Sequence, residues 1–408
     1  MKPENKFPRL LRHCSRFRQA VIRGMGVTFA LVLFSDARSQ ETKAPEGARD
    51  SLTVQKARTA TVTGRGKKVF YTQQWNLEDL PHYKPEQTVT GTIKFWGSNY
   101  FADGNLGQYW AEGFAKYHPG IKLDYDLKTA AAAIPGLLTG VADVGINRKI
   151  GWKEALAYQR LFERDPLEIV AVTGSFDVPG WSNALVFVVN KDNPISKLTI
   201  EQLDGILGSE RSGGWVGTEW HPEFARGPEK NIRTWGQLGL TGEWADKPIH
   251  VYGLNLQYQQ AIDLSQWILK GSDKWTEGLR MYANYAYADG SLAIGAKLLI
   301  DDVGKDRYGI GYGSHSYLTP NTKVIALAPR DSNKFVTPSL ETVRDRSYPL
   351  HDEVYFYMNR EKGKPLDPKL REFVRYILSQ EGQQAVQRDG KYLPLTAEVV
   401  REQLKKLE

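Results

Sequence analysis

From residue 91 onward, short apolar runs alternate with longer stretches in which apolar residues recur every three or four positions. Residues 92–96 are a short run that favours a strand, and residues 142–146 are a short apolar run that also resembles a strand, whereas residues 106–117 place apolar side chains on one helical face. Strands followed by helices in this order favour a parallel sheet covered by helices. The pattern therefore predicts an α/β fold.

The same alternation continues to the end of the chain. The strand at 184–189 is apolar throughout, which predicts burial on both faces. Residues 208–248 show little periodicity and are rich in Gly and Trp, so we expect a long surface insertion there. Further helices are expected at 130–138, 152–161, 199–207, 259–270, 291–301 and 368–379, and further strands at 121–127, 168–173, 308–312, 323–327 and 353–358.

The first residues have the pattern of an export signal. Five arginines precede the apolar run 25–34, and the small residues Ala37 and Ser39 follow it. The run is shorter than the roughly 20 residues that a membrane-spanning helix needs. We expect a signal peptide over residues 1–39, cleavage near Ser39, a periplasmic location, and an extended arm over residues 40–89.

Charge and cysteine content narrow the possible partners. Residues 1–39 hold eight of the 54 Lys and Arg and two of the 47 Asp and Glu, leaving 46 basic and 45 acidic residues. A nearly neutral remainder gives no electrostatic support for binding nucleic acid. The single cysteine, Cys14, precedes the apolar run, so we expect neither a disulfide nor a lipid anchor.

Several segments together resemble the phosphate-binding proteins of phosphate ABC transporters. They are Gly-Thr-Ile-Lys-Phe-Trp-Gly-Ser at 91–98, Ala-Asp-Val-Gly-Ile-Asn-Arg at 142–148, Leu-Val-Phe-Val-Val-Asn-Lys-Asp-Asn-Pro at 185–194 and Val-Tyr-Phe-Tyr-Met-Asn at 354–359. The resemblance implies a periplasmic-binding-protein fold of type II, with two α/β lobes, each a mixed, mostly parallel sheet flanked by helices. Lobe one would hold residues 90–189 and 314–408, and lobe two residues 190–313.

The function that the resemblance implies is capture of a small oxyanion, phosphate first, for an ABC-transporter permease. The protein would be a monomer that needs no cofactor and no metal and is not an enzyme. A binding or sensor module that has lost transport is the alternative on the same fold.

The ends of three predicted strands carry the candidate ligand-binding residues. Ser98 and Asn99 follow the first strand, Thr129 opens a helix after the second, and Asn147 and Arg148 follow the third. Ligands of open α/β sheets bind outside the carboxyl ends of strands, and a guanidinium there can make a bidentate contact with an oxyanion.

Each of these residues also has an ordinary structural interpretation. Ser98 and Asn99 suit a tight turn, and Thr129 suits a helix N-cap. Arg148 could instead pair at the surface with an acid on the following helix, such as Glu154.

One segment departs from the family pattern. The family commonly has Gly-Arg-x-x-x-Ser-Gly-Thr before a helix, whereas this chain has Gly-Leu-Asn-Leu-Gln-Tyr-Gln-Gln at 253–260. Gln257 and Tyr258 remain as polar candidates, but the arginine is absent. We therefore expect weaker oxyanion binding than in a member that keeps the family loop.

A serine hydrolase is the competing enzyme class. Ser314 and His315 adjoin, and Asp301 and Asp302 lie upstream, but the Gly-x-Ser-x-Gly elbow is missing. Ser314 also suits either a cleft-lining position or a hydroxyl-rich turn. The histidines are scattered, without the spacing of a zinc site.

Overall fold

The computed structural model describes residue 47 and residues 49–408. The predicted signal peptide, residues 1–39, therefore lies outside the described residues. Within the described part, none of the helices is both long and apolar enough to cross a membrane.

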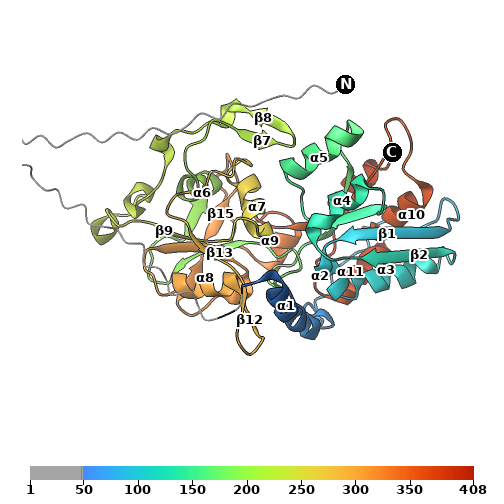
Figure 1. The fold of residues 1–408 in the computed structure, drawn as a ribbon, viewed down its shortest axis with the longest axis horizontal. Helices are drawn as coiled ribbons and strands as arrows, with labels where there is room; N and C mark the ends of the chain where they lie inside the picture. Colours follow the sequence, from blue (N-terminus) through green and yellow to red (C-terminus); the bar gives the residue numbers. More distant parts are fainter. Residues whose placement is uncertain (1–46, 48) are drawn as a thin grey trace, which may run out of the picture. The chain divides into compact units, whose positions relative to one another are not determined.

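Two five-stranded mixed sheets organise the described chain (Figure 1). The first has the order β2-β1-β3-β16-β4, in which β1 is parallel to β2 and β3, and β16 is antiparallel to β3 and β4. Its strands are β1 Gly91–Gly97, β2 Ile121–Asp126, β3 Val144–Asn147, β4 Leu167–Thr173 and β16 Glu353–Met358. These strands with their helices form lobe one.

The second sheet forms lobe two and has the order β10-β9-β13-β5-β14. Strand β9 is parallel to β10 and β13, whereas β5 is antiparallel to β13 and β14. The strands are β5 Val186–Asn190, β9 His250–Leu254, β10 Arg280–Tyr282, β13 Gly309–Gly313 and β14 Thr322–Val324. The α/β fold with two mixed sheets is confirmed.

Helices cover both sheets because their apolar faces pack on them. In lobe one, Trp110 and Phe373 from two helices pack edge-on against Phe356 or Phe95 of the sheet, and all four are fully buried. Lobe one has α2 Asn99–Asp103, α3 Leu106–Ala115, α4 Ala133–Leu138, α5 Trp152–Phe162, α10 Pro368–Ile377, α11 Gln380–Asp389 and α12 Ala397–Lys405; lobe two has α6 Ile200–Leu207, α7 Gln259–Trp267, α8 Gly295–Val303 and α9 Leu340–Arg344.

Two crossing segments join the lobes. The chain leaves lobe one after β4 and returns to it with β16, and the two passages are hydrogen-bonded, Gly174 N to Asp352 O at 2.7 Å and Leu185 N to Leu350 O at 3.1 Å. The expected lobe boundaries at 189 and 314 differ from this arrangement, because β5 and β14 both belong to the second sheet. An all-apolar strand such as β5 carries no signal of which sheet it enters.

The expected extended arm is wrong for part of its length, because Ser51–Gly66 forms helix α1. Asp50 caps it by accepting from Thr53 N at 2.9 Å. Threonine is not favoured inside helices, but the threonines of α1 bond back within it: Thr59, Thr61 and Thr63 each donate to the carbonyl four residues earlier, at 2.8 to 2.9 Å.

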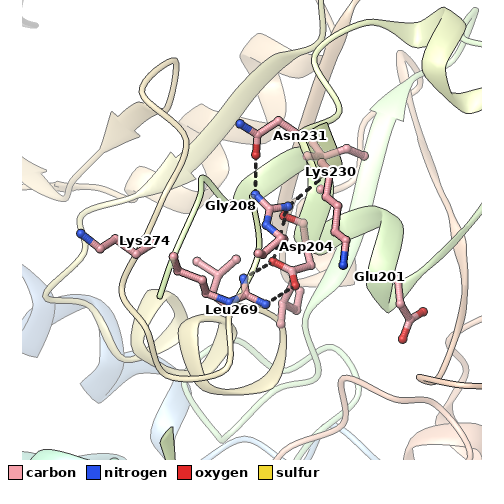
Figure 2. A network of polar contacts seen from close by, with 12 residues as sticks. Glu201, Asp204, Gly208, Lys230, Asn231, Leu269 and Lys274 are labelled. Carbon is pink, nitrogen blue, oxygen red and sulfur yellow. Dashed lines mark hydrogen bonds and ion pairs between the residues drawn. The ribbon is translucent and has the colours of Figure 1, made fainter. Parts of the chain in front are cut away.

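The insertion at 208–248 is held to lobe two by a buried ionic network around Asp204 of α6 (Figure 2). Arg211 donates to both carboxylate oxygens of Asp204 at 2.7 Å, and Arg226 donates to the Asp204 carbonyl at 3.0 Å. Trp235 and Trp244 enter the core of lobe two. The insertion therefore folds as part of the lobe, and it adds the β7–β8 hairpin, Gly214–Val216 and Glu219–His221.

Two further short pairs, besides the β7–β8 hairpin, complete the set of strands in the described residues. Strands β6 Lys197–Thr199 and β15 Ala326–Ala328 pair in parallel, and β11 Tyr285–Ala286 and β12 Leu292–Ala293 form a hairpin. The helix predicted at 291–301 begins later, at Gly295, because residues 292–293 pair as β12. The helix expected over residues 106–117 is α3, and a separate short helix, α2, precedes it.

Candidate functional site

A cavity of about 430 Å³ lies between the lobes, where several strands end. The segments that follow β1, β2 and β3 in lobe one, and β9 and β13 in lobe two, all line it. This is the position at which open α/β sheets bind ligands. Six predicted site residues line the cavity: Ser98, Asn99, Thr129, Arg148, Gln257 and Tyr258.

Ser98 and Thr129 both bring hydroxyl groups to the cavity without using them in the fold. Ser98 is the N-cap of α2 and Thr129 precedes a short 3₁₀ helix at 130–132, yet neither side chain makes a capping hydrogen bond. The ordinary N-cap interpretation of these residues therefore does not describe their side chains. Both hydroxyls can donate to a bound group.

Arg148 lies between two buried carboxylates rather than beside Glu154. Its Nη1 donates to Oδ2 of Asp263 at 2.8 Å, and its Nε lies 2.9 Å from Oδ2 of Asp352 without the alignment of a hydrogen bond. Both carboxylate side chains are at most 2% exposed. Arg148 belongs to lobe one, Asp263 to α7 of lobe two, and Asp352 to a crossing segment, so this ionic triad ties all three parts together.

The triad carries two acids for one base, and burial acts against their charges. Burial raises the pKa of Asp352 to about 8, although the charge of Arg148 opposes the rise. Burial also raises the pKa of Asp263. For Arg148 burial favours the neutral form, but the attraction of Asp352 and Asp263 is larger and leaves the pKa of Arg148 raised.

Asn147 does not line the cavity, contrary to its expected role. Its amide donates to Oε1 of Glu154 at 3.2 Å, and its Oδ1 accepts from Arg148 N at 2.8 Å. Glu154 in turn accepts from Gly151 N at 3.1 Å, which closes the first turn of α5. Asn147 thus fixes the loop that carries Arg148.

Gln257 and Tyr258 lie where α7 begins. The hydroxyl of Tyr258 accepts from Asn284 N at 2.8 Å, so the ring bridges two segments of lobe two. Gln257 N donates to Oδ1 of Asn255 at 2.9 Å, which shapes the turn before the helix. Gln259 and Gln260, the first residues of α7, also line the cavity.

The Ser314 region is part of the cavity wall and does not form a hydrolase triad. Ser314 Oγ lies 3.0 Å from Ser316 Oγ, and the His315 ring packs on Phe176 at 4.6 Å between centroids. Asp302 lies on α8, and its carboxylate accepts a hydrogen bond from the Tyr282 hydroxyl at 2.6 Å. Among the described residues, these groups form no Ser–His–Asp chain of hydrogen bonds.

Sequence reasoning missed the part of the wall that α1 provides. Gln55, Arg58, Thr61, Val62 and Arg65 line the cavity at spacings of three or four residues, as one face of a helix. The cap Asp50 and the small Ala57 and Gly66 were the available signals of this helix. The cavity wall also contains Ser182, Asn183 and Asn284.

A larger hollow of about 840 Å³ lies elsewhere, between the start of β4, residues 360–365 and the end of the chain. Its wall mixes cations with the carboxylates of Asp165, Glu168, Glu361 and Glu408. By contrast, the described residues that line the interlobe cavity include three arginines and no aspartate or glutamate. The interlobe cavity is therefore the better candidate for an anion.

Comparison with known proteins identifies the family. The PBP superfamily domain matches residues 84–381. The phosphate-binding protein PstS of Pseudomonas aeruginosa is 31% identical over 330 residues, which cover 80% of this chain and 90% of that protein. The chain belongs to the PstS family of periplasmic binding proteins.

Two further comparisons cover less of the sequence or have lower similarity. The protein SphX of Synechococcus elongatus is 28% identical over 54% of this chain and 56% of its own. An ABC-type phosphate transport receptor from Vibrio cholerae is 18% identical, with a TM-score of 0.45, over 74% of this chain and 99% of its own. The PstS relatives are named as binding proteins, in agreement with the expectation that this chain is not an enzyme.

Proposed function

We propose that this protein captures an inorganic oxyanion, phosphate first, in the cavity between its lobes and delivers it to an ABC transporter. The observation that carries the proposal is the charge of the wall: Arg58, Arg65 and Arg148 line the cavity, and among the described residues no carboxylate lines it. Acids behind the wall pair with Arg58 and Arg148, whereas Arg65 has no ion pair among these residues, so the wall keeps a positive charge that attracts anions.

The neutral groups of the wall suit a tetrahedral anion. Ser98 and Thr129 offer hydroxyl donors from lobe one, and the start of α7 faces the same space from lobe two. Backbone N–H groups at a helix start favour anions. Closure of the two lobes would bring hydrogen-bond donors from both of them to the ligand, so that ligand binding would stabilise the closed form.

The cellular setting is proposed on the family and the sequence. The relatives named phosphate-binding protein PstS support phosphate as the first ligand to test. The Arg-rich start and apolar run of residues 1–39 support export to the periplasm. The resemblance to phosphate-binding proteins of ABC transporters supports a monomer that delivers its ligand to a permease.

Calorimetric titration of the purified, ligand-stripped protein with phosphate tests the proposal, with sulfate and molybdate as further ligands. Ser98→Ala and Thr129→Ala should each weaken phosphate binding by about tenfold or more, because a hydrogen bond to a charged group contributes about 1.5–3 kcal/mol. Thr63→Ala is the matched control, since that hydroxyl bonds within α1 on its exposed side. Binding of none of these oxyanions would overturn the proposal.

A further inference from the structure

Helix α1 lies between α2 and the β12 hairpin and so contacts both lobes (Figure 1). It contacts α2 of lobe one and the β11–β12 hairpin of lobe two. Gly66 at its end sits so close to α2 that an added Cβ would lie 2.0 Å from the Asp103 carbonyl oxygen. The helix is thus packed against the lobes, and its inward face is part of the binding cavity.

The positive charge of the cavity wall is distributed unevenly among its three arginines. Arg148 faces Asp263 and Asp352, so its charge is already balanced by buried acids. Arg58 pairs with Asp103 at 3.2 Å and lies over the Tyr100 ring at 4.3 Å. The paired acids therefore weaken the positive electrostatic potential that these two guanidiniums produce in the cavity.

Arg65 differs from the other two. Its Nη2 donates to the carbonyl of Pro179 in a crossing segment at 2.6 Å, and its guanidinium lies 5.4 Å from the Trp181 ring centroid. Among the described residues, no carboxylate lies within ion-pair distance of Arg65, and its Nε and Nη1 have no hydrogen-bond partner. It is held in place by neutral groups while its charge stays unbalanced.

We propose that Arg65 of α1 is an anion-binding residue, supplied from outside the two sheets and replacing the positive charge that the segment 253–260 lacks. The inference rests on the proposed oxyanion function. An arginine fixed through one nitrogen keeps its remaining N–H groups for the ligand, and a guanidinium matches the geometry of an oxyanion. The anion would then contact α1 as well as both lobes.

The test measures the phosphate dissociation constant of the full chain carrying Arg65→Gln, Arg65→Lys or Lys56→Gln. Lys56→Gln removes the same charge from the exposed side of α1 and is the matched control. Arg65→Gln should weaken binding by about tenfold or more, since one charge-assisted hydrogen bond is lost. Arg65→Lys should restore part of the loss, and Lys56→Gln should stay within about twofold of the parent.

Thermal unfolding of the ligand-free variants separates binding from a purely structural role. Without ligand, Arg65→Gln should have the same melting temperature as the parent, and added phosphate should raise that temperature less than it does in the parent. Equal affinities for Arg65→Gln and Lys56→Gln would overturn the inference while leaving the proposed function intact. A loss of affinity accompanied by lower ligand-free melting, and not restored by Lys, would overturn it in favour of a structural contact. A parent that binds no oxyanion would instead overturn the proposed function.

Discussion

Replacing Arg148 by alanine should destabilise the protein strongly, because it leaves two buried carboxylates without their base. Asp263 and Asp352 are 1% and 2% exposed, so water cannot take the place of the guanidinium. Removing one partner of a buried ion pair typically costs about 3–5 kcal/mol. We expect a loss in this range at pH 7, measured by urea unfolding of the ligand-free protein.

The pH dependence of this loss gives an independent check. Without Arg148 the attraction that lowers the pKa of both acids disappears, so their pKa values rise further. Asp352, whose pKa is already about 8 beside the arginine, is then neutral at pH 7 as well as at pH 5, so the pH-dependent part of the penalty comes from Asp263 and should shrink as pH falls toward 5. The double variant Arg148→Ala with Asp263→Asn should recover part of the loss at pH 7, because it removes the acid that carries the unpaired charge.

The control and the refuting result are both defined by the structure. Arg160→Ala removes an exposed arginine from the outer side of α5 and should change stability by less than about 0.5 kcal/mol. Because the chain has two lobes, fluorescence and circular dichroism must give the same transition before a free energy is taken. An Arg148→Ala variant within about 1 kcal/mol of the parent at pH 7 would refute the assigned role of the triad.

Two further predictions concern the same junction between the lobes. Asp352→Asn should flatten the dependence of stability on pH. Because the pKa of Asp352 is raised from 3.8 to about 8, its contribution to the free energy of unfolding is complete below pH 3.8 and is lost as pH rises to about 8. The urea midpoint of the Asn variant relative to that of the parent should therefore be higher at pH 8 than at pH 5. Trp215→Ala should remove a stacking contact with Trp152, at 4.4 Å between centroids, that contributes about 0.5–1.5 kcal/mol, and small-angle scattering should then detect more open molecules.

The sheets were largely predictable because strands and helices leave local patterns. The strands expected at 92–96 and 353–358 are β1 and β16, with bounds that differ by no more than one residue. The lobe boundary was not predictable from such runs, since β5 is apolar on both faces and would read the same in either sheet. Which sheet a buried strand joins depends on distant partners.

The candidate site was predictable only where it follows strand ends. Ser98, Thr129 and Arg148 could be found because each follows a strand of one parallel array. The partners of Arg148 could not be found, because Asp263 lies 115 residues away and shows no local pattern. The contribution of α1 to the site was also missed, because a segment with several threonines has a composition typical of extended chain. In the structure the threonine hydroxyls donate to carbonyls within the helix, which the sequence does not reveal.

Affinity in this protein should depend on residues that do not touch the ligand. The Lys153–Asp273 pair at 3.1 Å and the Trp152–Trp215 stack each join lobe one to lobe two, and none of these four residues lines the cavity. Opening the cavity must break these contacts, and the measured affinity is the intrinsic affinity scaled by the fraction of molecules in the binding-competent form. Substitutions at these contacts therefore change the open fraction, whereas Arg65→Gln changes the intrinsic affinity.

A variant of the first kind should alter binding of every oxyanion by the same factor, because the scaling is independent of the ligand. A variant of the second kind should have effects that differ with the charge and geometry of the anion. The pattern across phosphate, sulfate and molybdate, rather than the size of any single change, therefore assigns a residue to closure or to contact.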